Sequence, residues 1–321
     1  MKSVYREARW AKLQEKKEAG ELVSYDFIGK QGEVSYRFIK KQAGFIDDVQ
    51  YYDISSYRGT GGPCIEWCND GQELELMKSF TQDFQQYCKN NNIIAEFAKL
   101  DPWAANASVI SEVLGADFYG YFYCNDLTEN FYEKAYNRRS KRAIKKAIDA
   151  NVSVKFDFDG VTIPKFLELY QNTVDKFQVS AYYKFTAEEL EEYFEVFKGV
   201  CFFSNEVKDG EIITSVLSVM SEDIVHYLYL GSNPEFAHCQ ANSLLTYQTS
   251  LLGKQYGRKL IDMGGGKKGG NIEQFKLNFV AENGVIPYYA IKKIHNQTIY
   301  DTMVQKAGAI INPVFFPLYR G

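Results

Sequence analysis

A lysine set between two aromatic residues is the first candidate for chemistry in this sequence. Phe275 and Phe279 are four residues apart, so on a helix they share one face, with Lys276 beside it. If that face is buried, the Lys276 amine stands at the rim of an apolar surface, within reach of a cleft. There it could stabilise a developing negative charge. A lysine whose stem merely covers the core would have the same spacing.

A glycine-rich turn precedes this lysine in the chain. Asp262-Met263-Gly264-Gly265-Gly266 follows a β-rich run, and its unobstructed amides could approach an anion or a substrate backbone. The glycine spacing also fits a dinucleotide-binding loop, but the next helix is short and the next strand ends in lysines rather than an acid, which excludes that interpretation. The P-loop pattern fails because no Ser or Thr follows the lysine. A plain surface loop would explain the same residues.

Six positive charges fall within residues 138–146, in a chain whose formal net charge is −4. On a helix, Arg138, Arg142 and Lys145 share one face, and Arg139 adds a further arginine. Arginine forks suit bidentate contacts with phosphate, so this segment is a candidate site for a phosphate-bearing ligand. A solvated, charge-rich helix face would use the same residues.

Other catalytic and metal-binding patterns are missing from the sequence. It has no G-x-S-x-G nucleophile elbow, its six cysteines form no C-x-x-C, and its three histidines have no metal-ligand spacing. The paired acidic residues lie where turns and helix starts explain them. His226, in a β-rich run, is expected to be structural. We therefore expect neither a metal site nor a covalent nucleophile.

Size and composition predict folded domains. The chain has 321 residues, of which 45% are hydrophobic and 16% aromatic, which excludes a disordered chain. The negative net charge excludes a global attraction to nucleic acid. No apolar run is long enough for a membrane span or resembles a signal peptide, so we expect a cytoplasmic protein.

The elements that position these residues follow the same order in both halves of the chain. That order is hairpin, further segment, helix, strand, short helix and strand, and it predicts a duplicated α/β (α+β) unit. The first set is expected at residues 22–28, 34–39, 74–88, 93–98, 105–114 and 117–124, and the second at 200–207, 211–220, 224–230, 241–256, 260–263, 272–278 and 285–291. Further helices are expected at residues 4–19, 128–150 and 296–306, with two helical stretches after residue 150.

Five motifs in chain order, the first of which combines a short segment with the loop that follows it, carry a resemblance to a known family. They are Tyr52-Asp53-Ile54 with Tyr57-Arg58-Gly59-x-Gly61-Gly62-Pro63, Arg138-Arg139-Ser140-Lys141-Arg142, Ala241-Asn242-x-Leu244-Leu245, Asp262-x-Gly264-Gly265-Gly266 and Phe275-Lys276-x-x-Phe279. Together they resemble the FemAB-like branch of the GNAT acyltransferase superfamily. The resemblance implies tandem GNAT-like domains, each a mixed, mostly antiparallel sheet flanked by helices. We expect an N-terminal domain at residues 1–127, and a linker helix with the C-terminal domain at residues 128–321.

The resemblance also implies an activity. Members pass an aminoacyl or acyl group from aminoacyl-tRNA or acyl-CoA to an amine of a cell-envelope precursor, of peptidoglycan or polysaccharide, that is nucleotide- or lipid-linked. No tightly bound cofactor and no enzyme nucleophile are needed, because the amine attacks an already activated carbonyl. The implied roles are catalytic for Lys276, donor-binding for Phe275, Asn242, Gly264, Gly265 and Gly266, and acceptor- or phosphate-binding for Tyr57, Arg58, Gly61, Gly62, Arg138, Arg139 and Arg142.

One segment departs from the pattern of CoA-dependent relatives. Such enzymes cradle pyrophosphate on a glycine-rich turn before the central helix, whereas residues 235–242 contain no glycine. This favours aminoacyl-tRNA as the donor. Two alternatives stay open: a CoA-dependent N-acetyltransferase that acts on an amino sugar, and a catalytically degenerate GNAT pair that binds nucleotide or RNA.

Overall fold

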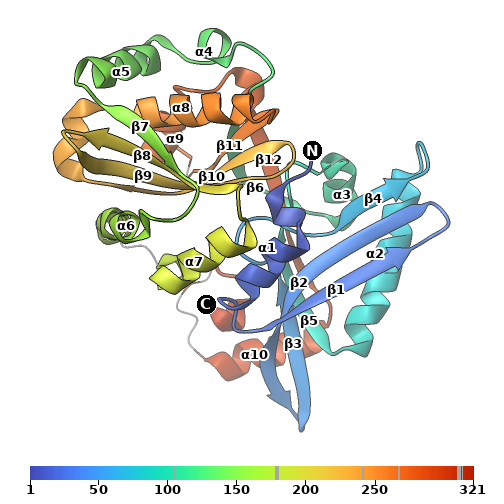
Figure 1. Cartoon of the computed structure of the whole chain (residues 1–321). Coiled ribbons are helices and arrows are strands. Elements are labelled where there is room, and N and C mark those ends of the chain that lie inside the picture. The colour runs from blue at the N-terminus through green and yellow to red at the C-terminus, as the bar shows by residue number, and fades with distance from the viewer. Residues whose placement is uncertain (105, 178–180, 241, 267, 309–311, 313) are drawn as a thin grey trace. The chain divides into compact units, whose positions relative to one another are not determined.

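The computed structural model describes residues 1–321 with the exception of 105, 178–180, 241, 267, 309–311 and 313 (Figure 1). Contacts divide the described chain into two units. Unit 1 comprises Met1 and residues 5–119 and 287–321, and unit 2 comprises residues 2–4 and 120–286. Each unit has a mostly antiparallel sheet flanked by helices, so the expected fold class is confirmed. Nowhere in the described ranges is a helix both long and apolar enough to cross a lipid bilayer.

The sheet of unit 1 has the strand order β1-β2-β3-β5-β12, and β4 pairs separately with β2. β3 and β5 are parallel, because the chain returns through α2 between them. The strands are β1 (Glu21–Ile28), β2 (Gly32–Ile46), β3 (Val49–Ser55), β4 (Cys64–Cys68), β5 (Ile93–Lys99) and β12 (Val285–Ile294). The helices are α1 (Ala8–Glu15), α2 (Glu73–Asn90), α3 (Ala107–Leu114), α10 (Gln297–Ala307) and η5 (Leu318–Arg320), and η1 (Val4–Arg6) joins the two units in the chain.

Helix α2 shows how the sequence sets the packing of unit 1. Its apolar residues recur at helical spacing, and Leu76, Met77, Phe80 and Phe84 are buried. The rings of Phe80 and Phe84 stack with centroids 5.5 Å apart, and Phe84 also contacts Tyr36 of β2. Large aromatic rings bury the most apolar surface per residue, so the packing of these rings between α2 and β2 stabilises unit 1 strongly. The helix expected at residues 74–88 is confirmed.

The sheet of unit 2 has the strand order β6-β11-β10-β9-β8-β7, and β10 and β11 are parallel. The strands are β6 (Asp117–Asp126), β7 (Ser153–Asp157), β8 (Cys201–Lys208), β9 (Glu211–Met220), β10 (Ile224–Ser232) and β11 (Leu260–Gly265). The helices are α4 (Phe131–Lys134), α5 (Arg138–Asp149), α6 (Ile163–Phe177), η2 (Ala181–Tyr183), α7 (Ala187–Val196), η3 (Pro234–Cys239), α8 (Asn242–Gln255), α9 (Asn271–Lys276) and η4 (Glu282–Gly284).

Helices cover both faces of the unit 2 sheet. α8 and α5 lie over one face, and α6 and α7 lie over the other (Figure 1). α5 buries Ser140, Ala143, Ile144 and Ala147, which recur at i, i+3, i+4 and i+7, and it packs on α8. α8 is therefore covered by the sheet on one side and by α5 on the other, and its buried residues are small or aliphatic.

The duplicated order of elements is present, but the last strand of each set is exchanged. The two sets run β1-β2-β3-α2-β5 and β8-β9-β10-α8-β11. β6, which closes the first set, pairs with β11 in unit 2, whereas β12, which closes the second, pairs with β5 in unit 1. For this reason the units differ from the expected ranges 1–127 and 128–321: residues 120–127 join unit 2, and residues 287–321 join unit 1.

The single helix expected at residues 128–150 is wrong. The chain forms α4 and α5 there, and Asn137 lies between them. Its backbone is extended, and its side-chain oxygen accepts hydrogen bonds from the amides of Arg139 and Ser140 at 2.9 and 3.0 Å. Such an N-cap residue has a non-helical conformation and begins a new helix.

Other differences concern short elements. The helix expected at residues 4–19 is interrupted at Glu7, whose backbone is extended. β3, β4 and β7 were not expected. For β3 the reason is the turn before it, Asp47-Asp48, where both residues have positive φ and no glycine marks the turn. Three predicted positions, Ala105 and Ala241 at helix starts and Lys267 in the glycine-rich turn, lie outside the described residues.

Gly231 on β10 provides a test of the packing in unit 2. A Cβ at this position would lie 2.4 Å from the Tyr170 nitrogen and 2.6 Å from the Leu169 carbonyl carbon, both in the backbone of α6. We expect Gly231→Ala to lower the free energy of unfolding by about 1–3 kcal/mol or more, because helix and sheet must separate. Urea denaturation measures this change.

The control for this prediction is Gly257→Ala. A Cβ there would meet no atom within 4 Å, so the variant should lose only the cost of a positive φ, on the order of 1 kcal/mol. If the two variants are destabilised equally, the close approach of α6 to β10 does not constrain the fold.

Candidate functional site

A fork between two parallel strands forms the centre of the candidate site. The pairing of β10 with β11 covers Ile224–His226 and Leu260–Asp262, that is, three residue pairs. Directly beyond it, β10 bulges between Tyr227 and Tyr229, and the register of β11 with β6 shifts between Asp262 and Gly265. The strands therefore separate after His226 and Asp262, and beyond that point their facing edges no longer pair with each other.

A pocket of about 1370 Å³ occupies this fork. Its walls come from β10, β11, η3 and α9, from the start of α8, and from the ends of α5 and α6 that lie on opposite faces of the sheet. Carboxamide side chains are frequent in the lining, among them Asn172, Asn233, Gln240, Asn242, Gln274 and Asn278. The charged lining residues are Arg139, Asp175 and Lys276. Such a lining suits a large polar ligand with many neutral hydrogen-bonding groups and limited negative charge.

Lys276 is the last residue of α9 and lines the pocket beside the fork. Its Nζ donates a hydrogen bond to the Gly265 carbonyl oxygen at 2.6 Å and lies 5.9 Å from the ring centroid of Tyr123. Burial lowers the pKa of Lys276 to about 8, and the nearby negative charge of Asp262 opposes that shift. A substantial fraction of this amine is therefore neutral near pH 8. As expected, Phe279 is in the core and Phe275 packs against it.

Polar contacts at the start of α9 fix the position of this short helix. The Tyr123 hydroxyl donates to Glu273 Oε1 at 2.6 Å, and the Gly269 amide donates to the other carboxylate oxygen. The first of these hydrogen bonds is the main cause of a lowered pKa of Glu273, which thus stays ionised. These hydrogen bonds attach α9 to β6 and to the glycine-rich turn, and they thereby fix the position of Lys276 at the end of α9.

A buried carboxyl group lies under the start of α8. Glu206 of β8 is fully buried, and its Oε1 accepts a hydrogen bond from the Leu245 amide at 3.1 Å. Burial raises the pKa of Glu206 from 4.5 to about 8, so the group is largely protonated at neutral pH. An amide in the first turn of α8 is thus engaged by the protein's own side chain.

The connection between β10 and α8 forms η3 instead of an open glycine turn. Its amides have partners inside the connection: Glu235 N donates to Asn233 Oδ1, Phe236 N to Asn233 O, and Gln240 N to Ala237 O. The Ser243 amide donates to Gln240 O as well. These four amides are therefore already hydrogen-bonded, whereas a phosphate cradle needs amides that point to a ligand.

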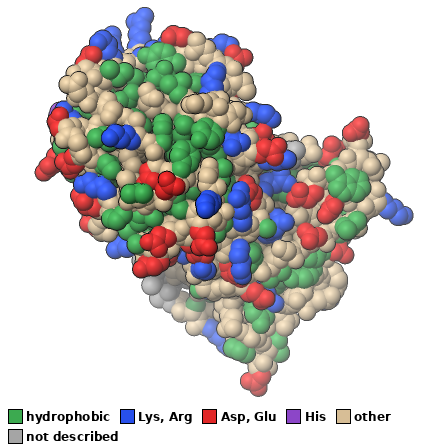
Figure 2. Space-filling model, in the orientation of Figure 1, with side chains coloured by type: hydrophobic (Ala, Val, Ile, Leu, Met, Phe, Trp, Pro, Cys, Tyr) green, Lys and Arg blue, Asp and Glu red, His purple; other side chains and the backbone are tan. Residues whose placement is uncertain are grey.

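The basic residues of α5 lie on its exposed face. Arg138, Arg139 and Arg142 are exposed, and none of them forms an ion pair with another described residue, whereas Lys141 and Lys145 pair with Glu133 and Asp149. Arg139 also lines the pocket. Lys and Arg side chains project at the end of the molecule where α5 lies (Figure 2).

The predicted acceptor-binding residues of the glycine loop belong to unit 1. Tyr57, Arg58, Gly61 and Gly62 are buried. The Tyr57 hydroxyl donates to the Tyr5 carbonyl at 2.8 Å, and the Gly61 amide donates to the Lys99 carbonyl at 2.7 Å. Their contact with an acceptor stays a prediction.

Five of the predicted residues therefore meet in one pocket: Lys276, Phe275, Asn242, Gly265 and Arg139. Gly264 and Gly266 form the adjoining turn, and Arg138 and Arg142 lie outside the pocket lining. The sequence analysis missed Tyr123, Glu273 and Glu206, although an acid inside the apolar run of β8 was a possible signal for Glu206. Among the described residues, no group of three His, Cys, Asp or Glu side chains is arranged to hold a metal ion.

A family match covers the part of the chain that forms the pocket. Residues 134–277 match a family described as acetyltransferase (GNAT) domain. This segment is therefore similar to GNAT acetyltransferase domains, which supports acyltransferase activity in general. A comparison with curated proteins found no match to this sequence.

Solved structures share the fold over nearly the whole chain. FemX has a TM-score of 0.67 and 14% identity, with 94% of each chain covered. The C-terminal domain of a proposed lysylphosphatidylglycerol synthetase from Agrobacterium fabrum has a TM-score of 0.53 and 9% identity, covering 92% of this chain and 94% of that one. A tandem GNAT protein from the clavulanic acid biosynthesis pathway has a TM-score of 0.51 and 9% identity, covering 90% of this chain and 94% of that one. The expected resemblance to the FemAB-like branch is thereby confirmed at the level of fold.

The buried acid Glu206 predicts how stability depends on pH. Because its pKa is raised in the folded state, the native protein keeps a proton that the unfolded chain loses as pH rises from about 4.5 to 8. The wild type should therefore lose stability across that window, and Glu206→Gln, which cannot titrate, should not share this loss. We expect the variant's stability relative to wild type to rise by roughly 3–4 kcal/mol between pH 5 and pH 8, since most of the interval between the two pKa values lies in this range and one pKa unit is worth about 1.4 kcal/mol.

Urea denaturation at the two pH values measures this difference. The matched control is Glu191→Gln on the exposed face of α7, which should leave the pH dependence as in the wild type. A Glu206→Gln curve parallel to the wild-type curve would mean that Glu206 is ionised in the folded protein.

Proposed function

We propose that this protein is a FemAB/GNAT-like N-acyltransferase that transfers an aminoacyl or acyl group to an amine of a cell-envelope precursor, of peptidoglycan or polysaccharide. The observation that carries the proposal is the position of Lys276, an amine with a lowered pKa in the wall of the pocket in the GNAT domain. Its hydrogen bond to Gly265 holds Nζ at the fork, where the separated strands leave room for a carbonyl group.

The proposed reaction needs no covalent intermediate on the enzyme. The acceptor amine attacks the activated carbonyl carbon, a C–N bond forms, and the C–O bond of an aminoacyl ester or the C–S bond of a thioester breaks. The amine proton ends on the released hydroxyl or thiol. In the tetrahedral intermediate the carbonyl oxygen carries negative charge, and the protonated Lys276 amine stabilises that oxyanion. The pocket contributes by aligning donor and acceptor.

Aminoacyl-tRNA is the donor that the pocket favours over acyl-CoA. Five amides of η3, its C-cap and the first turn of α8 are engaged within the protein, by Asn233, Ala237, Gln240 and Glu206. They are the amides of Glu235, Phe236, Gln240, Ser243 and Leu245. A pyrophosphate bound there would have to displace those partners. By contrast, the carboxamides of the lining suit the ribose and base of a terminal nucleotide, and the exposed arginines of α5 suit a nucleic-acid backbone.

Two features support a cell-envelope acceptor. The fold is similar to that of FemX, and another similar structure is described as a lysylphosphatidylglycerol synthetase domain, whose name denotes an aminoacylated lipid. The acceptor-binding residues we propose are those of the glycine loop in unit 1, Tyr57, Arg58, Gly61 and Gly62. The alternative enzyme, a CoA-dependent N-acetyltransferase on an amino sugar, has the GNAT family match in its favour. A degenerate nucleotide- or RNA-binding GNAT pair would use the α5 arginines without catalysis.

Replacement of Lys276 tests the catalytic assignment. We expect Lys276→Ala to lower the single-turnover rate of transfer at least about 100-fold, because one oxyanion donor is lost. The assay uses charged tRNA or acetyl-CoA as donor, and a UDP-linked muramyl peptide or an amino sugar as acceptor. Donor binding, measured as the rise in melting temperature with each donor alone, should persist in the variant.

The control is Lys254→Ala, which removes another lysine of unit 2. Lys254 donates hydrogen bonds to the carbonyl oxygens of Thr128 and Glu129, just before α4. That variant should transfer at the wild-type rate. Near wild-type transfer by Lys276→Ala would refute the role of Lys276. Melting-temperature shifts with CoA and none with charged tRNA would favour the acetyltransferase alternative.

Charge reversal on α5 tests the tRNA interface. We expect Arg138→Glu, Arg139→Glu and Arg142→Glu together to weaken binding of charged tRNA at least about tenfold and to flatten its salt dependence, because fewer counterions are released. Filter binding between 50 and 200 mM salt measures both effects. The matched control replaces three exposed lysines of unit 1, Lys30, Lys78 and Lys89, by glutamate and so changes the net charge by the same amount. Equal losses in both triple variants would show that only net charge matters.

A further inference from the structure

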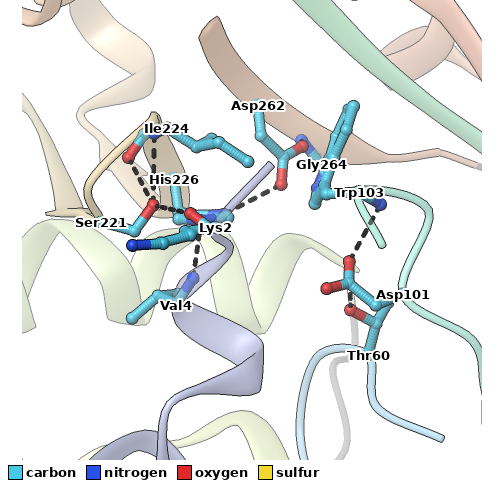
Figure 3. Close-up of polar contacts among 10 residues, drawn as sticks. All are labelled: Lys2, Val4, Thr60, Asp101, Trp103, Ser221, Ile224, His226, Asp262 and Gly264. Atoms are coloured by element: carbon cyan, nitrogen blue, oxygen red, sulfur yellow. Dashed lines mark hydrogen bonds and ion pairs between the residues drawn. The ribbon is translucent and has the colours of Figure 1, made fainter. Parts of the chain in front are cut away.

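We propose that His226 is a positioning residue for the candidate catalytic lysine: together with Asp262 it fixes the glycine-rich turn whose Gly265 carbonyl holds the Lys276 amine. The inference deepens the proposed function, since the importance of this amine rests on it. The hydrogen bonds that carry the inference run from residues 2–4 through β10 and β11 to α9, all within unit 2. Figure 3 shows the first part, from residues 2–4 to His226, Asp262 and Gly264.

The first step concerns the proton of the imidazole. His226 and Asp262 are buried, with exposed fractions of 0% and 1%. The Val4 amide donates to His226 Nε2 at 3.1 Å, and His226 Nδ1 lies 3.1 Å from Asp262 Oδ2. Because Nε2 accepts a hydrogen bond, its lone pair is occupied and the proton of a neutral ring is on Nδ1. His226 therefore donates to Asp262.

The second step leads from Asp262 to the amine. Asp262 Oδ1 accepts a hydrogen bond from the Gly264 amide at 2.7 Å, and Gly264 has φ +73°, a conformation that glycine adopts without strain. The next carbonyl oxygen, that of Gly265, accepts the hydrogen bond from Lys276 Nζ. One carboxylate thus joins the last residue pair of the parallel ladder to the turn that carries the lysine's acceptor.

The third step explains why residues 2–4 belong to unit 2. The Lys2 amide donates to Asp223 Oδ2 at 2.8 Å, and the Ser221 hydroxyl donates to the Lys2 carbonyl at 2.6 Å. Both partners lie in the turn between β9 and β10, and Val4 is fully buried. Figure 3 shows this segment next to His226, with its backbone amide directed at the ring. The segment thereby selects which ring nitrogen faces Asp262.

Two substitutions at the same position separate the two hydrogen bonds of the ring. An Asn side chain places its amide near the position of Nδ1, so His226→Asn keeps a donor to Asp262. A Gln side chain reaches the position of Nε2, so His226→Gln keeps an acceptor for the Val4 amide and loses the donor to Asp262. The proposal expects the Lys276 environment to persist in the Asn variant and to change in the Gln variant.

The measured quantity is the apparent pKa of the Lys276 amine, which reports on its surroundings. Trace acetylation of the whole protein with acetic anhydride at a series of pH values, followed by mass spectrometry of the peptide that contains Lys276, gives the apparent pKa of this amine. The titratable groups around it are Asp262 of β11, Tyr123 of β6 and Glu273 of α9. In the wild type the pKa should be about 8. In His226→Gln it should rise by about one unit or more toward the value of an exposed lysine, because the freed amine becomes hydrated.

Each outcome decides the proposal. A shift in His226→Gln together with a wild-type value in His226→Asn supports it. Equal shifts in both variants would indicate a general loss of packing, and no shift in either would show that the turn holds its shape without His226; both results overturn it. Lys254 serves as the internal reference in every sample, and its reactivity should not change.

A further variant keeps the test decisive if the histidine variants do not fold. Val4→Pro removes the amide that donates to Nε2 at a position, the first of η1, where proline is tolerated. In this variant the histidine ring remains but nothing holds its proton on Nδ1, unlike the Asn variant, whose amide is itself the donor. The pKa of Lys276 should therefore shift in the same direction as in His226→Gln, and an unchanged pKa would overturn the role of residues 2–4. The labelling result does not depend on acyl transfer, so a Lys276→Ala variant that still transfers would refute the proposed function and leave this measurement intact.

Discussion

The constraint on which unit 2 depends is that two parallel strands, β10 and β11, must part after three residue pairs. A parallel ladder that continued would fill the space that the pocket occupies. Separation is stable only if the backbone groups beyond the last pair find other partners, because an unpaired buried amide or carbonyl is costly. The fork is consequently surrounded by side chains that replace the missing ladder bonds, and it is these side chains that give the site its polarity.

Unit 1 shows what the same arrangement becomes without a fork. There β3 and β5 are joined through a helix in the same way as β10 and β11, and their pairing extends from Tyr52–Ile93 to Ser55–Phe97. This parallel pairing continues beyond the ends of the two strands, because the Gly61 amide donates to the Lys99 carbonyl oxygen and the Asp101 amide donates to the Gly61 carbonyl oxygen. The glycine loop thus closes the sheet that unit 2 leaves open. This difference agrees with a family match that covers residues 134–277 and not the first repeat.

The sequence predicts those parts that a local pattern determines. The apolar spacing of α2 and the Phe275–Phe279 pair each define an element or a face within a few residues. The break at Asn137 and the strand β7 were missed because a capping residue and a short edge strand compete weakly with helix-forming neighbours. Glu206 and Tyr123 acquire their roles from residues 39 and 150 positions away in the chain, Leu245 and Glu273, and no spacing rule connects such pairs. The exchange of β6 and β12 is likewise a matter of register between distant strands.

The ionisable groups around the fork follow one physical rule. His226, Asp262, Glu206 and Lys276 are buried or partly buried, which is unfavourable for their charged forms. Each of them, however, satisfies a backbone group beside the fork or its neighbouring bulge: the amides of Val4, Gly264 and Leu245, and the carbonyl of Gly265. An apolar replacement would remove the desolvation cost of the polar side chain, but it would leave the buried backbone group without a hydrogen-bond partner. The cost of burying the polar side chain is therefore offset by the hydrogen bond that it gives to the backbone. The polarity of the pocket is therefore a consequence of opening a parallel sheet, and an amine with a shifted pKa arises at the position where a carbonyl oxygen of that opened sheet needs a donor.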